Sequence, residues 1–259
     1  MWLFKKTKQI DKEILKYSKD SYCVKDNFKN KDYFLRQLGE VNERIDEYKT
    51  LFDNGEVKDK NVYYMLLSSR LLEKIGLLNT LGESKENIKS LVEEYCGAVE
   101  KESEHPLTYN EVKNILSLAY LYNLDIDKVN FVKKNMLKDT YIDASLDMLI
   151  NGMFLNKPIT SKDFCLKLTL SGNFKKTDGE FMNVVNAKNQ EEINTAFVEY
   201  LKTTKESFYK RQLKEYERLS EDRYTYTGSC DFMLTALAKM LKIDKNLLED
   251  SKFIDIDLI

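Results

Sequence analysis

The sequence predicts an all-α protein built of antiparallel helical hairpins that pack as a compact bundle or stack. Apolar residues recur at spacings of three and four, strand-like alternation is weak, and there are only nine glycines and two prolines in 259 residues. The chain is 42% hydrophobic and 32% charged, so it can bury a large core as one helical domain or two closely packed ones.

The first half contains three predicted helices. Residues 34–52 place six apolar residues on one face, with charges on the other side: Phe34, Leu38, Val41, Ile45, Tyr48 and Phe52. Residues 62–81 are apolar over more than half the circumference, which is typical of a central helix. Residues 85–101 combine an apolar face with an outward row of glutamates.

A domain boundary is expected at Pro106, because proline interrupts the helical pattern there and Thr108 with Glu111 forms a capping box for the next helix. We therefore predict an N-terminal helical domain over residues 1–105 and a C-terminal helical domain over residues 106–259. The helices expected in the second domain cover residues 109–122, 126–137, 141–150, 161–170, 178–186, 191–203, 205–219, 229–241 and 245–249.

No pattern in the sequence indicates catalysis. The single histidine, His105, has no visible orienting partner, and the glycines are scattered without a phosphate-binding loop. The four cysteines are widely separated, which predicts reduced thiols and no zinc site. The acidic runs fit no ligand loop, so we expect a protein that is not an enzyme and needs no metal or cofactor.

The charges are nearly balanced, with 41 basic and 43 acidic side chains. This balance argues against binding nucleic acid through bulk positive charge and against a uniformly acidic mimic of DNA. Charge is concentrated locally instead. Residues 1–38 carry an excess of +5, residues 83–104 an excess of -4, and the last eleven residues an excess of -3.

The beginning of the chain has only three apolar residues after Met1 and before Lys5 and Lys6, too few for the hydrophobic region of a signal peptide. No later stretch approaches the roughly 20 apolar residues of a membrane helix. We expect a cytoplasmic protein that does not interact with membranes.

The last 36 residues carry the most informative pattern, "YTYTGSCDFMLTALAKMLKIDKNLLEDSKFIDIDLI". Gly228 can supply a positive φ or a close backbone approach, and the apolar residues that follow predict a buried helix. Tyr224 and Tyr226 alternate before the glycine and are expected on one side of an extended segment, where their structural role would be to cover the final helix.

This arrangement resembles the end of the C-terminal domain of the PoNe immunity proteins, which protect bacteria from DNase toxins of the PoNe type. The resemblance extends upstream through "AFVEYLKTTKESFYKRQLKEYERLSEDRYTYTG", and "NKDYFLRQLGEVNERIDEY" with "NVYYMLLSSRLLEKIGLLNTLGESKENIKSLVEEYCGAVEKE" is similar to the N-terminal domain of that family. Family members often have tryptophan two residues after the glycine and glutamate three further on, where this chain has Cys230 and Met233.

The resemblance implies a protein that binds and neutralises a cognate PoNe-like DNase toxin by blocking its DNA-binding or active site. A helical scaffold or adaptor for a non-nuclease protein partner is the alternative. The candidate partner-binding residues are the local carboxylates and the two tyrosines: Glu93, Glu94, Glu100, Glu102, Glu104, Glu249, Asp250, Asp255, Asp257, Tyr224 and Tyr226. The C-terminal carboxylates are favoured slightly over the others, because they continue the segment most similar to the family.

Overall fold

The chain folds into two compact units. The structure is a computed structural model that describes residues 22–26, 29–102, 106–135, 144–154, 176–205, 210, 214, 226–251 and 253–259. Unit 1 comprises Met1–His105 with Thr225–Ser229, and unit 2 comprises Pro106–Tyr224 with Cys230–Ile259. The division falls between His105 and Pro106, but five residues of the expected second domain, Thr225–Ser229, belong to unit 1.

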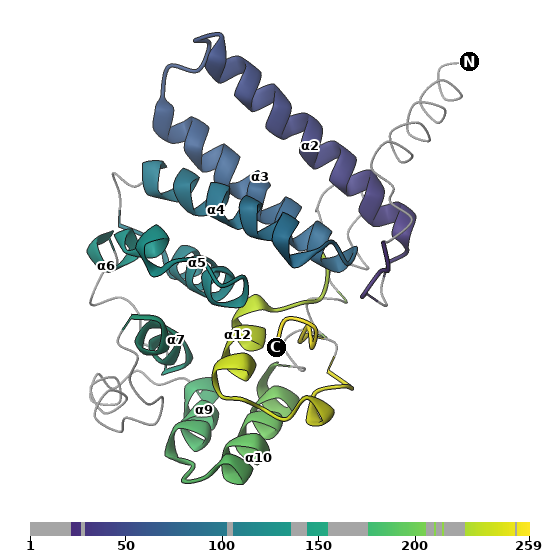
Figure 1. The fold of residues 1–259 in the computed structure, drawn as a ribbon, viewed down its shortest axis with the longest axis vertical. Coiled ribbons are helices and arrows are strands. Elements are labelled where there is room, and N and C mark those ends of the chain that lie inside the picture. The colour runs from purple at the N-terminus through teal and green to yellow at the C-terminus, as the bar shows by residue number, and fades with distance from the viewer. Residues whose placement is uncertain are drawn as a thin grey trace. The chain divides into compact units, whose positions relative to one another are not determined.

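Three consecutive helices form most of unit 1. They are α2 (Lys31–Asp53), α3 (Lys60–Thr80) and α4 (Lys85–Glu102). They lie side by side in Figure 1, with α3 packed against both of the others. Because short connections join them, neighbouring helices run antiparallel.

The helices of unit 1 begin where the sequence offers capping side chains. Asn30 accepts the Tyr33 N–H at 2.9 Å, and Asp59 accepts the Asn61 N–H at 2.9 Å. Both helices therefore start slightly earlier than the apolar pattern alone predicts. Gly55 and Gly82, which follow α2 and α3, have φ values of +72° and +77°, a conformation that glycine adopts without strain.

The core of unit 1 contains most of the apolar faces predicted from the sequence, although Tyr48 and Phe52 of α2 are only half-buried. Phe34, Leu38, Val41 and Ile45 of α2 are all buried. The buried apolar residues of α3 and α4 are Tyr63, Leu67, Leu71, Ile75, Leu77, Leu78, Ile88, Val92, Tyr95, Cys96, Ala98 and Val99.

Unit 2 is also helical in the residues described. Its elements are α5 (Tyr109–Leu121), the 3₁₀ helix η1 (Ile126–Val129), α6 (Phe131–Asn135), α7 (Ala144–Phe154), α9 (Lys176–Asn186), α10 (Gln190–Tyr200), the π-helical turn η2 (Leu201–Lys205), α12 (Phe232–Met240) and the 3₁₀ helix η3 (Lys245–Leu247). The main packing pairs are α5 with α12 and α9 with α10, and α7 contacts α5, α9 and α12. The capping box of Thr108 and Glu111 is confirmed.

Two helices of unit 2 end in the same way. Asn123 after α5 and Lys242 after α12 have φ values of +52° and +53°. In each case the next residue closes the end, because Leu124 donates its N–H to the Ala119 carbonyl at 2.9 Å and Ile243 donates to the Ala238 carbonyl at 3.0 Å. Each helix is then followed by an aspartate that caps a 3₁₀ turn, Asp125 before η1 and Asp244 before η3.

The prediction of an all-α fold is confirmed, with local differences. The single helix expected over residues 126–137 is divided into η1 and α6, because the Asp125 cap favours a tight turn there. The helix expected over 161–170 and most of that over 205–219 lie outside the described residues. None of the described helices is long and apolar enough to cross a membrane.

Candidate partner-binding surfaces

Fewer acidic residues of α4 are available to contact a partner than their number in the sequence suggests. Glu94 accepts a hydrogen bond from Lys49 Nζ at 2.7 Å, and this ion pair raises the pKa of Lys49. Glu102 accepts a bond from Ser68 Oγ at 3.3 Å. Glu93 is half-buried, Glu100 is exposed, and Glu104 lies outside the described residues. Of the described members of this set, only Glu100 is fully exposed.

The C-terminal carboxylates differ from one another in exposure. Glu249, Asp250 and Asp257 are exposed, whereas Asp255 is buried. The Asp255 N–H donates to Thr235 Oγ1 at 3.3 Å, and its Oδ1 accepts the Asp257 N–H at 3.0 Å. Asp255 therefore holds the end of the chain in place, and its carboxylate is buried rather than presented at the surface.

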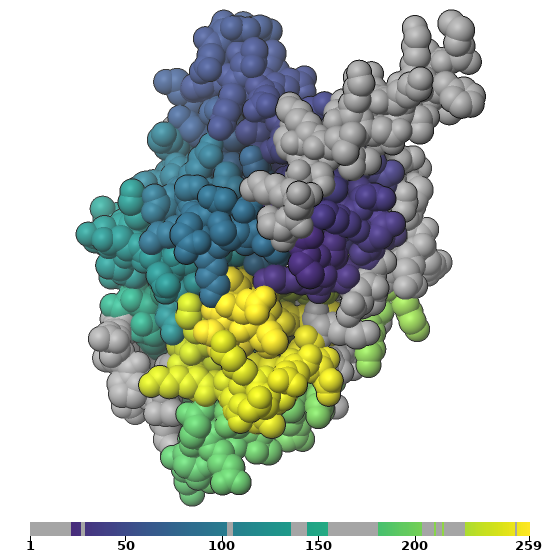
Figure 2. All heavy atoms as spheres, turned by 45° about the vertical axis from the view of Figure 1, so that its right-hand side comes forward, coloured from purple at the N-terminus to yellow at the C-terminus, as the bar shows by residue number. Residues whose placement is uncertain are grey.

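The described part of the C-terminal tail, residues 249–251 and 253–259, folds back onto α12, which explains the burial of Asp255. The Asp231 N–H donates to the Phe253 carbonyl at 2.8 Å, and Phe253, Ile254 and Leu258 are buried. Yellow C-terminal residues form a continuous area of the surface of unit 2 on the face drawn in Figure 2. The exposed carboxylates of the tail are thus carried by a segment with a fixed backbone.

Tyr226 is buried in unit 1 and does not present its side chain to a partner. Its hydroxyl donates to Asp26 Oδ2 at 2.6 Å, and its ring lies 6.1 Å from that of Phe34. The described contacts of Tyr226 are with the N-terminal part of the chain, and its expected role of covering the final helix stays a prediction. Tyr224 lies outside the described residues.

An acidic stripe on α2 was not among the predicted site residues. Five carboxylates on the solvent side of this helix are exposed, and we call them the α2 stripe: Glu40, Glu43, Asp46, Glu47 and Asp53. The same stretch contains two basic residues, Arg44 and Lys49, and Lys49 pairs with Glu94. Counting charge on the polar face of the helix, rather than in windows of sequence, would have found this stripe.

Two large apolar side chains are exposed on α3. Val62 is 42% exposed and Met65, almost one turn further, is 47% exposed. Nearby aromatic rings stabilise this end of the α2–α3 hairpin. Phe52 stacks on Tyr63 with ring centroids 4.0 Å apart, and Lys101 Nζ lies 5.4 Å from the Tyr64 centroid. Exposed apolar side chains with an ordered base are a common feature of binding surfaces.

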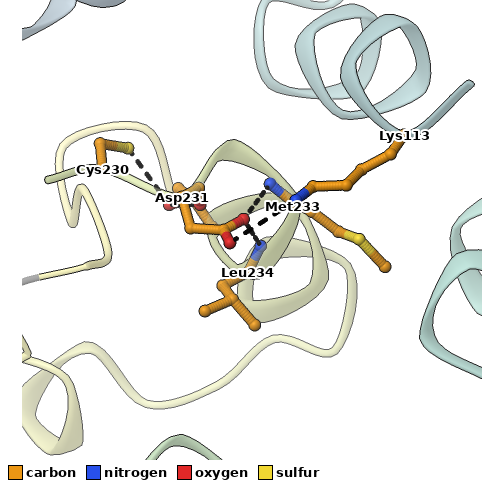
Figure 3. Close-up of polar contacts among 6 residues, drawn as sticks. Lys113, Cys230, Asp231, Met233 and Leu234 are labelled. Atoms are coloured by element: carbon orange, nitrogen blue, oxygen red, sulfur yellow. Dashed lines mark hydrogen bonds and ion pairs between the residues drawn. The ribbon is translucent and has the colours of Figure 1, made fainter. Parts of the chain in front are cut away.

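The beginning of α12 carries a connected set of polar contacts (Figure 3). Asp231 caps the helix by accepting the N–H groups of Met233 and Leu234 at 2.9 and 3.0 Å, and its other oxygen lies 3.9 Å from Lys113 Nζ. Cys230, the residue before the cap, has its sulfur 3.7 Å from Thr235 Oγ1. This is the position of the staple residue in a capped helix.

The chemistry of Cys230 favours a structural role. Although the residue keeps some exposed surface, burial of its thiol, together with the nearby Asp255 carboxylate, raises its pKa to about 12. A neutral thiol is a poor nucleophile and a poor metal ligand. Met233, where relatives often have glutamate, is buried. Among the residues that the structure describes, no group of three metal-ligating side chains is placed to hold an ion.

Comparison with known proteins gives a structural relative and no family assignment. No protein-family model matches the sequence, and no curated protein matches it. The crystal structure of protein PA2201 from Pseudomonas aeruginosa is similar over 97% of this chain and 94% of its own, with a TM-score of 0.63 and 11% sequence identity. At this identity the similarity establishes a shared fold and nothing further.

Proposed function

We propose that the protein is a cytoplasmic immunity protein that binds a PoNe-type DNase toxin and blocks it without chemistry of its own. The observation that carries this proposal is the resemblance of residues 224–259, and of the helices before them, to the PoNe immunity family. Helices that are ordered before binding support it, because a rigid surface loses little conformational entropy when it binds.

The inhibitory mechanism that we propose is electrostatic. A DNase holds phosphates in a positively charged groove, so exposed carboxylates on a rigid helical surface can occupy that groove or its rim and exclude DNA. Three sets of carboxylates are candidates: the tail set (Glu249, Asp250 and Asp257), the α4 set (the exposed Glu86 and Glu100 with the half-buried Glu93) and the α2 stripe. The pairing of Glu94 with Lys49 weakens the case for α4.

The test is coexpression with a candidate nuclease toxin encoded by a neighbouring gene. Cells that make the nuclease should survive only when the immunity protein is present, and the purified chain should capture a catalytically inactive form of the toxin. An unrelated nuclease toxin serves as the specificity control. If the cells die and purified toxin and chain do not associate, the proposal fails.

A scaffold or adaptor protein is the alternative function, and the exposed apolar pair Val62 and Met65 favours it. Such a surface suits an apolar partner rather than a phosphate-binding groove. Substituting both residues with serine would abolish partner capture under this alternative. The same substitutions would leave nuclease neutralisation unchanged if the carboxylates form the interface.

A further inference from the structure

Residues 226–229, which we call the strap, occupy a site in unit 1 that is shaped to receive them. The walls of this site come from three segments: the extended residues 22–26, the first turn of α2, and the last turns of α3. The strap lies more than a hundred residues downstream of all three. It belongs to unit 1, while the chain on both sides of it belongs to unit 2.

Hydrogen bonds to the strap involve both its backbone and its tyrosine. Asp26 is buried and accepts the Tyr226 hydroxyl at 2.6 Å and the Ser229 N–H at 3.0 Å. The Tyr226 N–H donates to the Tyr33 hydroxyl at 3.1 Å. On the other side, the Thr80 hydroxyl donates to the Thr227 carbonyl at 2.7 Å.

Two glycines allow the close approach. Gly76 lies inside α3, and a Cβ atom there would meet Cβ and Oγ1 of Thr227 at 2.9 Å. Gly228 has a φ of +122°, and a Cβ atom on it would collide with the Thr80 hydroxyl. The helix thus has a notch at Gly76 that Thr227 fills, and the strap has a glycine where it passes Thr80.

The hydrogen bonds and the notch together define a specific peptide-recognition site. We infer that unit 1 is a receptor for an extended Tyr-Thr-Gly-Ser segment, and that this chain supplies the segment itself as a strap on which the folding of unit 1 depends. Without the strap, the buried Asp26 carboxylate would lose two donors, and the notch in α3 would be open.

Hydrogen exchange on the full-length chain tests this inference. Gly228→Ala should displace the strap and increase exchange at least tenfold, equivalent to about 1.4 kcal/mol, in residues 22–26, in the first half of α2 and in the second half of α3. The matched control is Gly55→Ala. Gly55 also has a positive φ, +72°, but a Cβ atom there meets nothing within 4 Å. This control should leave exchange in those segments within about twofold of the original chain, since strain at an exposed turn acts locally.

Tyr226→Phe keeps the test decisive if Gly228→Ala prevents folding. It removes only the hydroxyl that donates to Asp26, so a smaller increase in exchange is expected in the same segments. A peptide of residues 224–231, added in excess to the Gly228→Ala chain, should restore protection, and the same peptide with alanine in place of its glycine should not. Unchanged exchange in α2 and α3 of both variants overturns the dependence on the strap, and failure of the peptide to restore protection overturns the recognition site.

Discussion

Gly76 lies in the interior of α3, where alanine would favour the helix by about 1 kcal/mol. Its presence has a physical reason, because Thr227 of the strap occupies the space that a Cβ atom would need. A helical pattern read from the sequence gives no sign of this requirement, since the contact joins residues about 150 positions apart. The same holds for Asp26, whose two partners in the strap, Tyr226 and Ser229, are even more distant in sequence.

We predict that Gly76→Ala destabilises the protein despite the better helix propensity of alanine. Crowding against Thr227, a stiff β-branched residue, should cost roughly 1–3 kcal/mol and outweigh the gain in propensity. Combining it with Thr227→Gly should recover much of the loss, and unfolding in urea measures both. Gly97→Ala in α4, where a Cβ atom meets nothing within 4 Å, is the matched control and should be neutral or stabilising. If Gly76→Ala stabilises the protein, the strap can move away from the new methyl group without a loss of unfolding free energy.

We predict that the three described cysteines react with thiol reagents at different rates. Burial raises the pKa of Cys96 and of Cys230 to about 12, while Cys23 is exposed. At pH 8, Cys23 should be labelled at least tenfold faster than either of the others, as resolved by mass spectrometry of peptides. Labelling of Cys230 as fast as that of Cys23 in the folded protein would contradict the raised pKa of its thiol.

The same thiols should make stability depend on pH in the alkaline range. The folded protein keeps their protons to a higher pH than the unfolded chain, whose ordinary value is 9.0. Their contribution to the free energy of unfolding is therefore complete below about pH 9 and is lost as the pH rises toward 12. Cys230→Ala should reduce the slope of stability against pH in this window.

At the scale of single helices, α3 shows what apolar periodicity can and cannot predict. Leu71 and Leu72 are equivalent in the sequence pattern, yet Leu71 is 1% exposed and Leu72 is only half-buried. The sequence indicates that α3 is central, because its apolar surface is wide. It does not indicate which of two adjacent leucines faces α2 and α4, since that depends on how the three helices rotate against one another.

We predict that Leu71→Ala costs roughly 2–5 kcal/mol of unfolding free energy, because it leaves a cavity in the core of unit 1. Leu72→Ala should cost clearly less. Chemical denaturation followed by circular dichroism measures both, and equal losses would mean that the two residues are packed alike.

The start of α12 is a second element whose stability depends on one residue. Asp231→Ala removes a cap that accepts two backbone N–H groups and should cost about 1–2 kcal/mol. Asp231→Asn retains an oxygen acceptor and should cost less. Lys113→Ala should have a small effect, because the ion pair is long at 3.9 Å. If Lys113→Ala and Asp231→Asn are as damaging as Asp231→Ala, charge pairing dominates over capping.

At the scale of the whole molecule, local patterns predicted the fold class, most helices and the capping box at Thr108. They did not predict the strap or the tail contacts, which depend on tertiary structure. Among the candidate site residues, Glu249 and Asp250 are exposed as the binding hypothesis requires, while Asp255 and Tyr226 are buried by long-range contacts. Local charge counts cannot separate these two groups, because they ignore how the chain folds back.

We predict that reversing one acidic set reduces toxin binding and its salt dependence. Variants with three changes to lysine in the tail set, in the α4 set, or in Glu40, Glu47 and Asp53 of the α2 stripe alter the net charge equally. Each therefore controls for the other two. Reversing the charges of the set at the interface should lower the association rate at low salt and make that rate less dependent on ionic strength. The circular dichroism spectrum should not change. If all three sets leave association unaffected, an apolar interface must replace the electrostatic one.

The position of the strap in the sequence also determines when unit 1 can finish folding during synthesis. The helices of unit 1 leave the ribosome early, but the strap follows the end of α4 by more than a hundred residues. At 5–20 residues per second, the nascent chain must wait on the order of 10 s before Asp26 and Gly76 can meet it. A chain released too soon would lack the segment that completes its first helices. Completion of unit 1 thus reports that translation has passed residue 229.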